Sequence, residues 1–144
     1  MSRRLSVGWR LRAAAAALIL PALVRSMSLA KLMHRAAPLP PHPHMPLDDR
    51  ALARWVTRIL SHLPGPWHLS CLNRSVVLYY LLRAAGRPVE LCIGAARISG
   101  PIKAHAWLML DGAPYLEGEA ERVTRLPVLA RFPDYAHPEH AHSV

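Results

Sequence analysis

The sequence has few cysteines, few acidic residues and no apolar run long enough to cross a membrane. Its 144 residues include two cysteines, Cys71 and Cys92. Two are too few for a disulfide framework, so a reducing cytosol is the expected compartment. The apolar run from Ala13 to Val24 holds about a dozen residues, against the ~20 that a transmembrane helix needs. Nine acidic residues stand against 18 lysines and arginines, which gives a net charge of +9.

The basic excess indicates an anionic partner, but the sequence carries no sign of nucleic-acid binding. The basic residues are almost all arginine and are spread along the chain, without a recognition-helix signature, zinc-finger spacing or RNA-binding motif. An acidic peptide, an acidic partner protein and an anionic membrane surface would each match the pI near 10.8. With 52% hydrophobic and 19% charged residues, the chain is expected to form one globular domain.

The first 36 residues contain basic residues and no acid. A charged start followed by an apolar stretch resembles a secretory signal peptide, but no clear small-x-small cleavage site comes before Arg25. We therefore expect a helix that packs on the domain, on a partner or on a membrane face, with a signal or anchor as the alternative. Residues 37–46 are rich in proline and predict an extended linker. His42 and His44 in this linker are expected to be solvated, and no metal site is predicted.

Two helices and a small antiparallel sheet are predicted beyond the linker. Apolar residues recur at helical spacing from Asp48 until Pro64-Gly65-Pro66. A second, more apolar helix begins at Ser70 and ends near Ala85. Strands are expected at residues 89–95, 102–110 and 113–119, followed by a short packed segment at 126–132. We divide the chain into an N-terminal helical segment with its linker (1–46), a core (47–135) and a loose tail (136–144).

Cys71 is the candidate nucleophile. Ser70 before it can cap the second helix, which places the thiol in the first helical turn. The positive end of the helix dipole favours thiolate over thiol there, and can lower a cysteine pKa from its usual value of about 8.5. The alternative is that Cys71 is a small buried hydrophobic residue, as Cys92 in its strand is expected to be.

His105 is the candidate base, and the acid that pairs with it depends on the hairpin register. A cysteine, then a histidine, then an acid is the chain order of papain-like and transglutaminase-like chemistry. A two-residue loop at Asp111-Gly112 would put Glu117 opposite Ala106, on the wrong face. A three-residue loop with Gly112 at a bulge would pair His105 with Glu117 directly, so function predicts the bulged turn. Glu119 is the reserve acid, and Asp111 is assigned to the turn.

Several short motifs together resemble the lasso-peptide leader peptidases, small cysteine proteases of the transglutaminase-like superfamily. They span about residues 50–120, and they are Cys71-Leu72-x-Arg74-Ser75, Gly86-x-Pro88, Ile93-Gly94, Ala104-His105-Ala106-Trp107 and Asp111-Gly112. The resemblance implies an α+β fold in which a papain/transglutaminase-like core carries the cysteine at a helix N-terminus against a small antiparallel sheet. By position it makes Cys71 the nucleophile, His105 the base and Glu117 the acid, without a cofactor.

The resemblance further implies that the enzyme cuts the leader from a ribosomally made precursor, and that a macrolactam synthetase (cyclase) then closes the ring. The N-terminal 45 residues are too few and too apolar for a fused recognition domain, so a separate leader-recognition protein is expected. Trp67 and Trp107 are candidate walls of the substrate cleft or core residues, and Arg74 pairs with an acid of the substrate or of the structure. The location is expected to be cytoplasmic or membrane-associated. The alternatives are another transglutaminase-like amidase or acyltransferase, and a basic membrane-associated adaptor.

Overall fold

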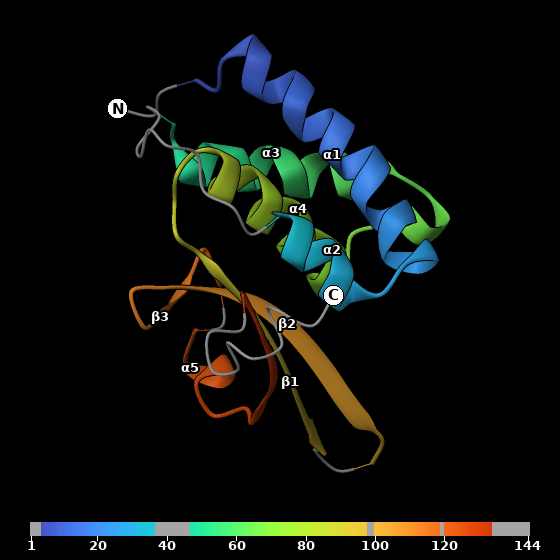
Figure 1. Cartoon of the computed structure of the whole chain (residues 1–144), viewed down its shortest axis with the longest axis vertical. Helices are drawn as coiled ribbons and strands as arrows, with labels where there is room; N and C mark the ends of the chain where they lie inside the picture. The colour runs from blue at the N-terminus through green and yellow to red at the C-terminus, as the bar shows by residue number, and fades with distance from the viewer. Residues whose placement is uncertain (1–3, 37–46, 98–99, 119, 134–144) are drawn as a thin grey trace.

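A layer of helices and a four-stranded antiparallel sheet make up the protein (Figure 1). The computed structural model describes residues 4–36, 47–97, 100–118 and 120–133. His42, His44, Glu119, the boundary at residue 46 and the predicted tail 136–144 lie outside these ranges. The helices are α1 (Val7–Ser26), α2 (Leu29–Ala36), α3 (Asp49–His62), the 3-10 turn η1 (Gly65–Trp67), α4 (Cys71–Ala84) and α5 (Ala120–Val123). The strands are β1 (Glu90–Arg97), β2 (Ile102–Leu110), β3 (Ala113–Tyr115) and β4 (Val128–Phe132).

Helix α1 packs on the domain, which was one of the positions expected for the N-terminal apolar stretch. Ser6 caps its start by accepting from the backbone N–H of Trp9 at 3.4 Å. Its buried face consists of Ala13, Ala16, Ala17, Leu20 and Pro21. Because most of these side chains are small, the backbone of α1 can approach α3 and α4 closely (Figure 1). With 20 residues, α1 is longer than the apolar run from Ala13 to Val24 on which the expectation of too short a segment rested. Among the described residues it is the one helix long and apolar enough, by length and composition, to cross a membrane. A core helix or a signal sequence has the same length and composition.

Helices α3 and α4 begin where the capping residues predict. Asp48 accepts from the backbone N–H of Ala51 at 3.0 Å, and Ser70 accepts from that of Asn73 at 3.1 Å. Helix α3 buries one side, whereas α4 is buried over most of its length, as its apolar sequence predicts. Gly86 follows α4 with a φ of +89°, a conformation that glycine adopts without strain. Leu52, Val56, Leu78, Leu82 and Leu91 are among the residues that fill the core between the helices and the sheet.

The sheet has the strand order β3-β2-β1-β4, and the predicted α+β class is confirmed. Strands β1 and β2 form the long central hairpin, and the segment expected to be packed at 126–132 supplies β4 at one edge. The third strand is shorter than predicted, because it ends at Tyr115 rather than near Glu119. Since β3 pairs with β2 only from Leu108 to Leu110, the rest of β2 has no strand on that side among the described residues.

The predicted bulged hairpin is wrong. Leu110 pairs with Ala113, so the loop has two residues, Asp111 and Gly112, with φ of +52° and +78°. Two left-handed residues in succession form the turn whose twist matches that of the flanking strands, and Asp-Gly is well suited to it. The local preference of Asp-Gly therefore set the register, and any pairing of His105 with Glu117 has to come about in another way.

Candidate active site

Cys71 is the first residue of α4, held by a tightly bonded connection. The Asn73 side chain donates to the backbone oxygens of Pro66 and His68 at 2.8 and 2.9 Å, which ties η1 and the following residues to the first turn. The thiol is free and partly exposed. Cys71 thus stands in the first turn of α4, among the backbone N–H groups that have no partner within the helix.

His105 and Glu117 are brought together. Nε2 of His105 lies 3.5 Å from Oε2 of Glu117, and the two side chains are 29% and 13% exposed. Nε2 itself is buried and makes no hydrogen bond within the described residues, so the two groups lie close together without being hydrogen-bonded. Leu116 makes it possible: with a φ of +57° it turns the chain out of the β3 direction, and the alternation of the strand no longer applies to Glu117.

Helix α4 meets β2 at the edge that β3 leaves uncovered. The Ser75 hydroxyl, one turn beyond Cys71, donates to the backbone oxygen of Ala106 at 3.1 Å and is buried. Ala106 is the neighbour of His105 along β2. The first two turns of α4 are therefore fixed against the part of β2 that carries the imidazole. Among the described residues no hydrogen bond joins Cys71 to His105. Catalytic hydrogen bonds are often long before substrate binds.

Arg74 links α4 to α3 and to the turn that precedes Glu117. Its Nε donates to the Thr57 hydroxyl at 3.2 Å, and its Nη2 donates to the backbone oxygen of Leu116 at 2.9 Å. Burial lowers the pKa of Arg74, and the nearby charge of Glu117 acts in the opposite direction. Of the two roles left open by the sequence, the structure shows contacts of Arg74 with the protein itself, and these hold the turn that delivers Glu117.

A second set of contacts, between Tyr115 and Asp49, holds the same turn. The Tyr115 hydroxyl makes a short hydrogen bond to the Asp49 carboxylate, which also pairs with Arg87 at 3.2 Å. Burial first, and then Asp49, raises the pKa of Tyr115 to about 12. Tyr115 is thus anchored to the start of α3 immediately before Leu116 and Glu117. Sequence reasoning missed Tyr115 and Asp49, because nothing in their local patterns links the two segments.

Trp107 supports the imidazole from within the core. It is 2% exposed and packs with Cys92 and Val123, while its ring stacks on that of His105 with centroids 5.9 Å apart. Gly94, the cross-strand partner of His105, leaves room for it: a Cβ there would lie 2.9 Å from the Trp107 ring and 2.7 Å from the Pro127 oxygen. Of the two positions expected for Trp107, a wall of the substrate cleft or the core, the structure shows the core.

Trp67 and Cys92 have structural contacts as well. The Trp67 indole N–H donates to the backbone oxygen of Leu18 at 2.7 Å, which ties η1 to α1. Cys92 is fully buried, as expected, and burial raises its pKa. Asp111 is exposed in the hairpin turn. Within the described ranges no three metal-binding side chains gather at one place.

A comparison with protein families gives one match. The family model described as the transglutaminase-like superfamily matches residues 7–131, which run from the start of α1 into β4. The match therefore includes the helices, the central hairpin and the three predicted site residues Cys71, His105 and Glu117. No curated protein and no solved structure gives a match.

Proposed function

Because the chain belongs to the transglutaminase-like superfamily, we propose that it is a cysteine peptidase that removes the leader from a ribosomally made lasso-peptide precursor. Cysteine-based enzymes are general in that superfamily. The observation that carries the proposal is the pair of His105 and Glu117, 3.5 Å apart on the edge of β2 against which the first turns of α4 are fixed. A partly exposed cysteine begins that helix.

The roles of the three side chains follow from this arrangement. Glu117 faces Nε2 of His105, so Nδ1 is the nitrogen left to exchange a proton with the Cys71 thiol. The thiolate attacks the scissile carbonyl, and His105 then protonates the departing amine to leave a thioester on Cys71. His105 next activates water, which hydrolyses the thioester. In this proposal the backbone N–H groups at the start of α4 hold the oxyanion, and such donors contribute about 3 kcal/mol each.

The proposal includes two partners. A separate leader-recognition protein presents the precursor, and a macrolactam synthetase joins the freed α-amine to an Asp or Glu side chain of the product. The family resemblance of the motifs supports both. On this reading the protease alone binds the precursor weakly, and recognition depends on the complex.

The proposed location is the cytoplasm, with α1 available to a membrane surface. The outer face of α1 exposes large apolar side chains, of which Val7 is 70%, Leu11 is 66% and Leu18 is 52% exposed. Arg12 and Arg25 are exposed on the same helix. Apolar side chains beside arginines are typical of helices that lie at a membrane interface.

Leader release is the direct test. The protein, the recognition protein and the precursor are mixed, and the leader and core peptides are identified by mass spectrometry. We expect cleavage by the wild type and by Cys92→Ala, and none by Cys71→Ala. Full cleavage by Cys71→Ala would end the proposal. Transfer of the acyl group to an added amine, with no hydrolysis, would favour an acyltransferase instead.

A further inference from the structure

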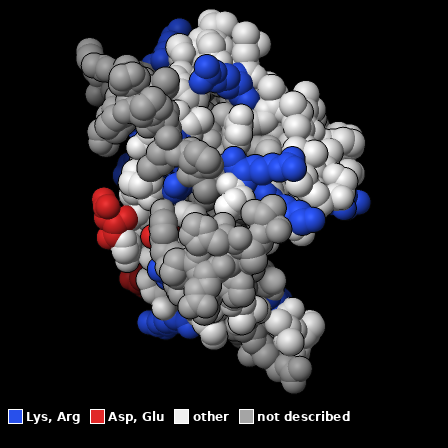
Figure 2. All heavy atoms as spheres, viewed as in Figure 1, with Lys and Arg blue, Asp and Glu red and all other residues white. Residues whose placement is uncertain are grey.

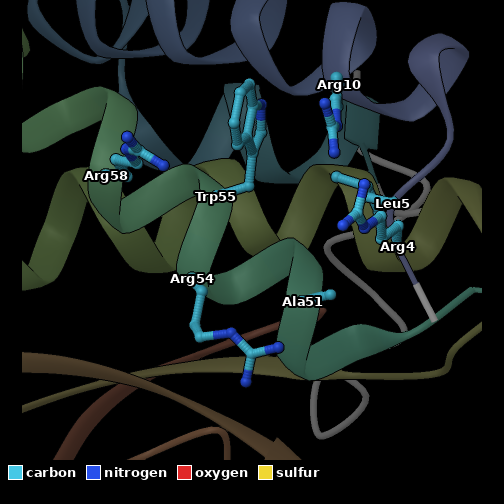
Figure 3. A pocket seen from close by; sticks show the side chains of 7 residues that line it. All are labelled: Arg4, Leu5, Arg10, Ala51, Arg54, Trp55 and Arg58. Carbon is cyan, nitrogen blue, oxygen red and sulfur yellow. The ribbon is translucent and has the colours of Figure 1, made fainter. Parts of the chain in front are cut away.

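Arginines gather around a hollow between α1 and α3, away from the candidate active site. Figure 3 shows this hollow, whose volume is about 380 Å³. Its walls include Arg4, Leu5, Arg10, Arg54, Trp55 and Arg58. No acidic residue is among its lining residues. On the face seen in Figure 2, basic side chains spread over the helical part, while acidic ones form a small group at one edge.

Two buried donors in this hollow have no acceptor. Arg10 reaches from α1 over the Trp55 ring, with its guanidinium carbon 5.1 Å from the ring centroid. Its Nε and the indole Nε1 of Trp55 are both buried and make no hydrogen bond within the described residues. Within the same ranges no ion pair involves Arg4, Arg10, Arg54 or Arg58. Both atoms are covered by the packing of α1 on α3 and lie out of a ligand's reach, whereas Arg4, Arg54 and Arg58 are exposed. Their guanidinium groups are therefore open to a ligand that supplies oxygen acceptors.

A second hollow of about 280 Å³ continues from the first toward the candidate active site. It shares Arg54 and Arg58 with the first hollow, and Thr57 and Arg74 also line it. Arg74 is the residue that donates to Leu116, next to Glu117. Arginines therefore follow one side of α3 from the α1 contact to the corner where α4 begins.

We propose that these two hollows bind an acidic segment of the peptide substrate, which then leads toward Cys71. The inference rests on the proposed function. Arg10, Arg54 and Arg58 hold carboxylates, since the guanidinium fork matches a carboxylate with two parallel hydrogen bonds. The partly exposed Trp55 gives an apolar side chain of the same segment a surface to pack on. A peptide is favoured over other anions because the track ends beside a site proposed to cut peptides, and because its walls are partly apolar.

Binding can be measured without turnover. The Cys71→Ala protein is titrated into a short fluorescein-labelled peptide of glutamate, leucine and glycine, and into a matched peptide with glutamine in place of glutamate. Fluorescence anisotropy should show saturable binding of the acidic peptide alone, weakening as salt is added. The double variant Arg54→Gln/Arg58→Gln should bind about tenfold more weakly. Arg50→Gln, exposed on α3 but outside both hollows, should bind as before.

Other results would overturn the inference. Equal binding of the glutamine peptide would remove the role of the carboxylates. Equal weakening by Arg50→Gln would mean that net charge alone attracts the peptide. Competition by inorganic phosphate or a short RNA at lower concentration than the acidic peptide would assign the site to another anion. Unchanged melting temperatures check that the variants fold.

The two proposals can fail separately. If the acidic peptide binds as described but no precursor is cut, the anion site stands and the peptidase assignment is wrong. If the precursor is cut equally well by the wild type and the double variant at low substrate concentration, the peptidase stands and the anion site plays no part. Cleavage with a raised KM in the double variant supports both.

Discussion

Nε2 of His105 lies 3.5 Å from Oε2 of Glu117, although the hairpin that carries them does not place the two residues opposite each other. The contact depends on the left-handed Leu116, which redirects the chain after β3. Arg74 of α4 holds that turn through Leu116, and Asp49 of α3 holds it through Tyr115. The pair is therefore a product of tertiary contacts rather than of strand register.

Replacing Glu117 tests the role of this pair. In Glu117→Gln the carboxylate that faces the imidazole is lost while the side chain keeps its size. Because the imidazolium formed during the reaction loses its counter-charge, leader release should fall about 10²- to 10⁴-fold. Mass-spectrometric rates measure the loss. The control Glu121→Gln, exposed on α5, should retain the wild-type rate. Equal rates for the two variants would remove Glu117 from the site.

The two thiols should react very differently. With iodoacetamide, the partly exposed Cys71 should be labelled quickly in the native protein. Cys92 should be labelled only after unfolding, since it has no exposed surface and burial raises its pKa. Peptide mapping after timed labelling gives both rates. Replacing His105 by alanine should slow the labelling of Cys71. If both thiols react slowly in the wild type, the result favours the alternative that the protein is a membrane-associated adaptor in which Cys71 is merely packed.

Gly94→Ala should disturb the support of His105. The new Cβ would lie 2.7 Å from the Pro127 oxygen and 2.9 Å from the Trp107 ring, so β4 or the indole has to move. We expect a loss of about 1–3 kcal/mol in the free energy of unfolding, measured with urea. Gly8→Ala, where a Cβ meets nothing within 4 Å, is the matched control and should cause no loss. A Gly94→Ala protein as stable as the wild type would contradict the close packing.

Ser75→Ala should loosen α4 from β2. The variant leaves the backbone oxygen of Ala106 without the donor that now lies 3.1 Å away. A buried acceptor without a partner costs about 1–3 kcal/mol, which urea unfolding will measure. Ser61→Ala, at an exposed position on α3, should cost less than about 0.5 kcal/mol. If Ser75→Ala keeps full stability yet loses activity, the bond positions the site without stabilising the fold.

Alkaline pH should weaken the anchor of the Glu117 turn. The pKa of Tyr115 rises from 10.0 to about 12, because burial and Asp49 favour the neutral phenol in the folded protein. Folding is therefore favoured by this group below pH 10, and the contribution is lost as the pH rises from 10 toward 12. Urea unfolding across this range should show a steeper loss for the wild type than for Tyr115→Phe. Tyr80→Phe, at an exposed position, should follow the wild type.

The sequence by itself determined the features that depend on neighbouring residues. Ser70 caps a helix that begins at Cys71, and Asp111-Gly112 forms a two-residue hairpin, because caps and turns are decided within a few residues. The prediction of a bulged hairpin was wrong because it chose the register that would pair His105 with Glu117 over the two-residue turn that Asp-Gly favours. Only the tertiary structure decided that Glu117 reaches His105, since the turn is held by contacts 42 and 66 residues apart in the chain, Arg74 to Leu116 and Asp49 to Tyr115. The arginine-lined hollow likewise exists only once α1 packs against α3 and brings Arg10 over Trp55.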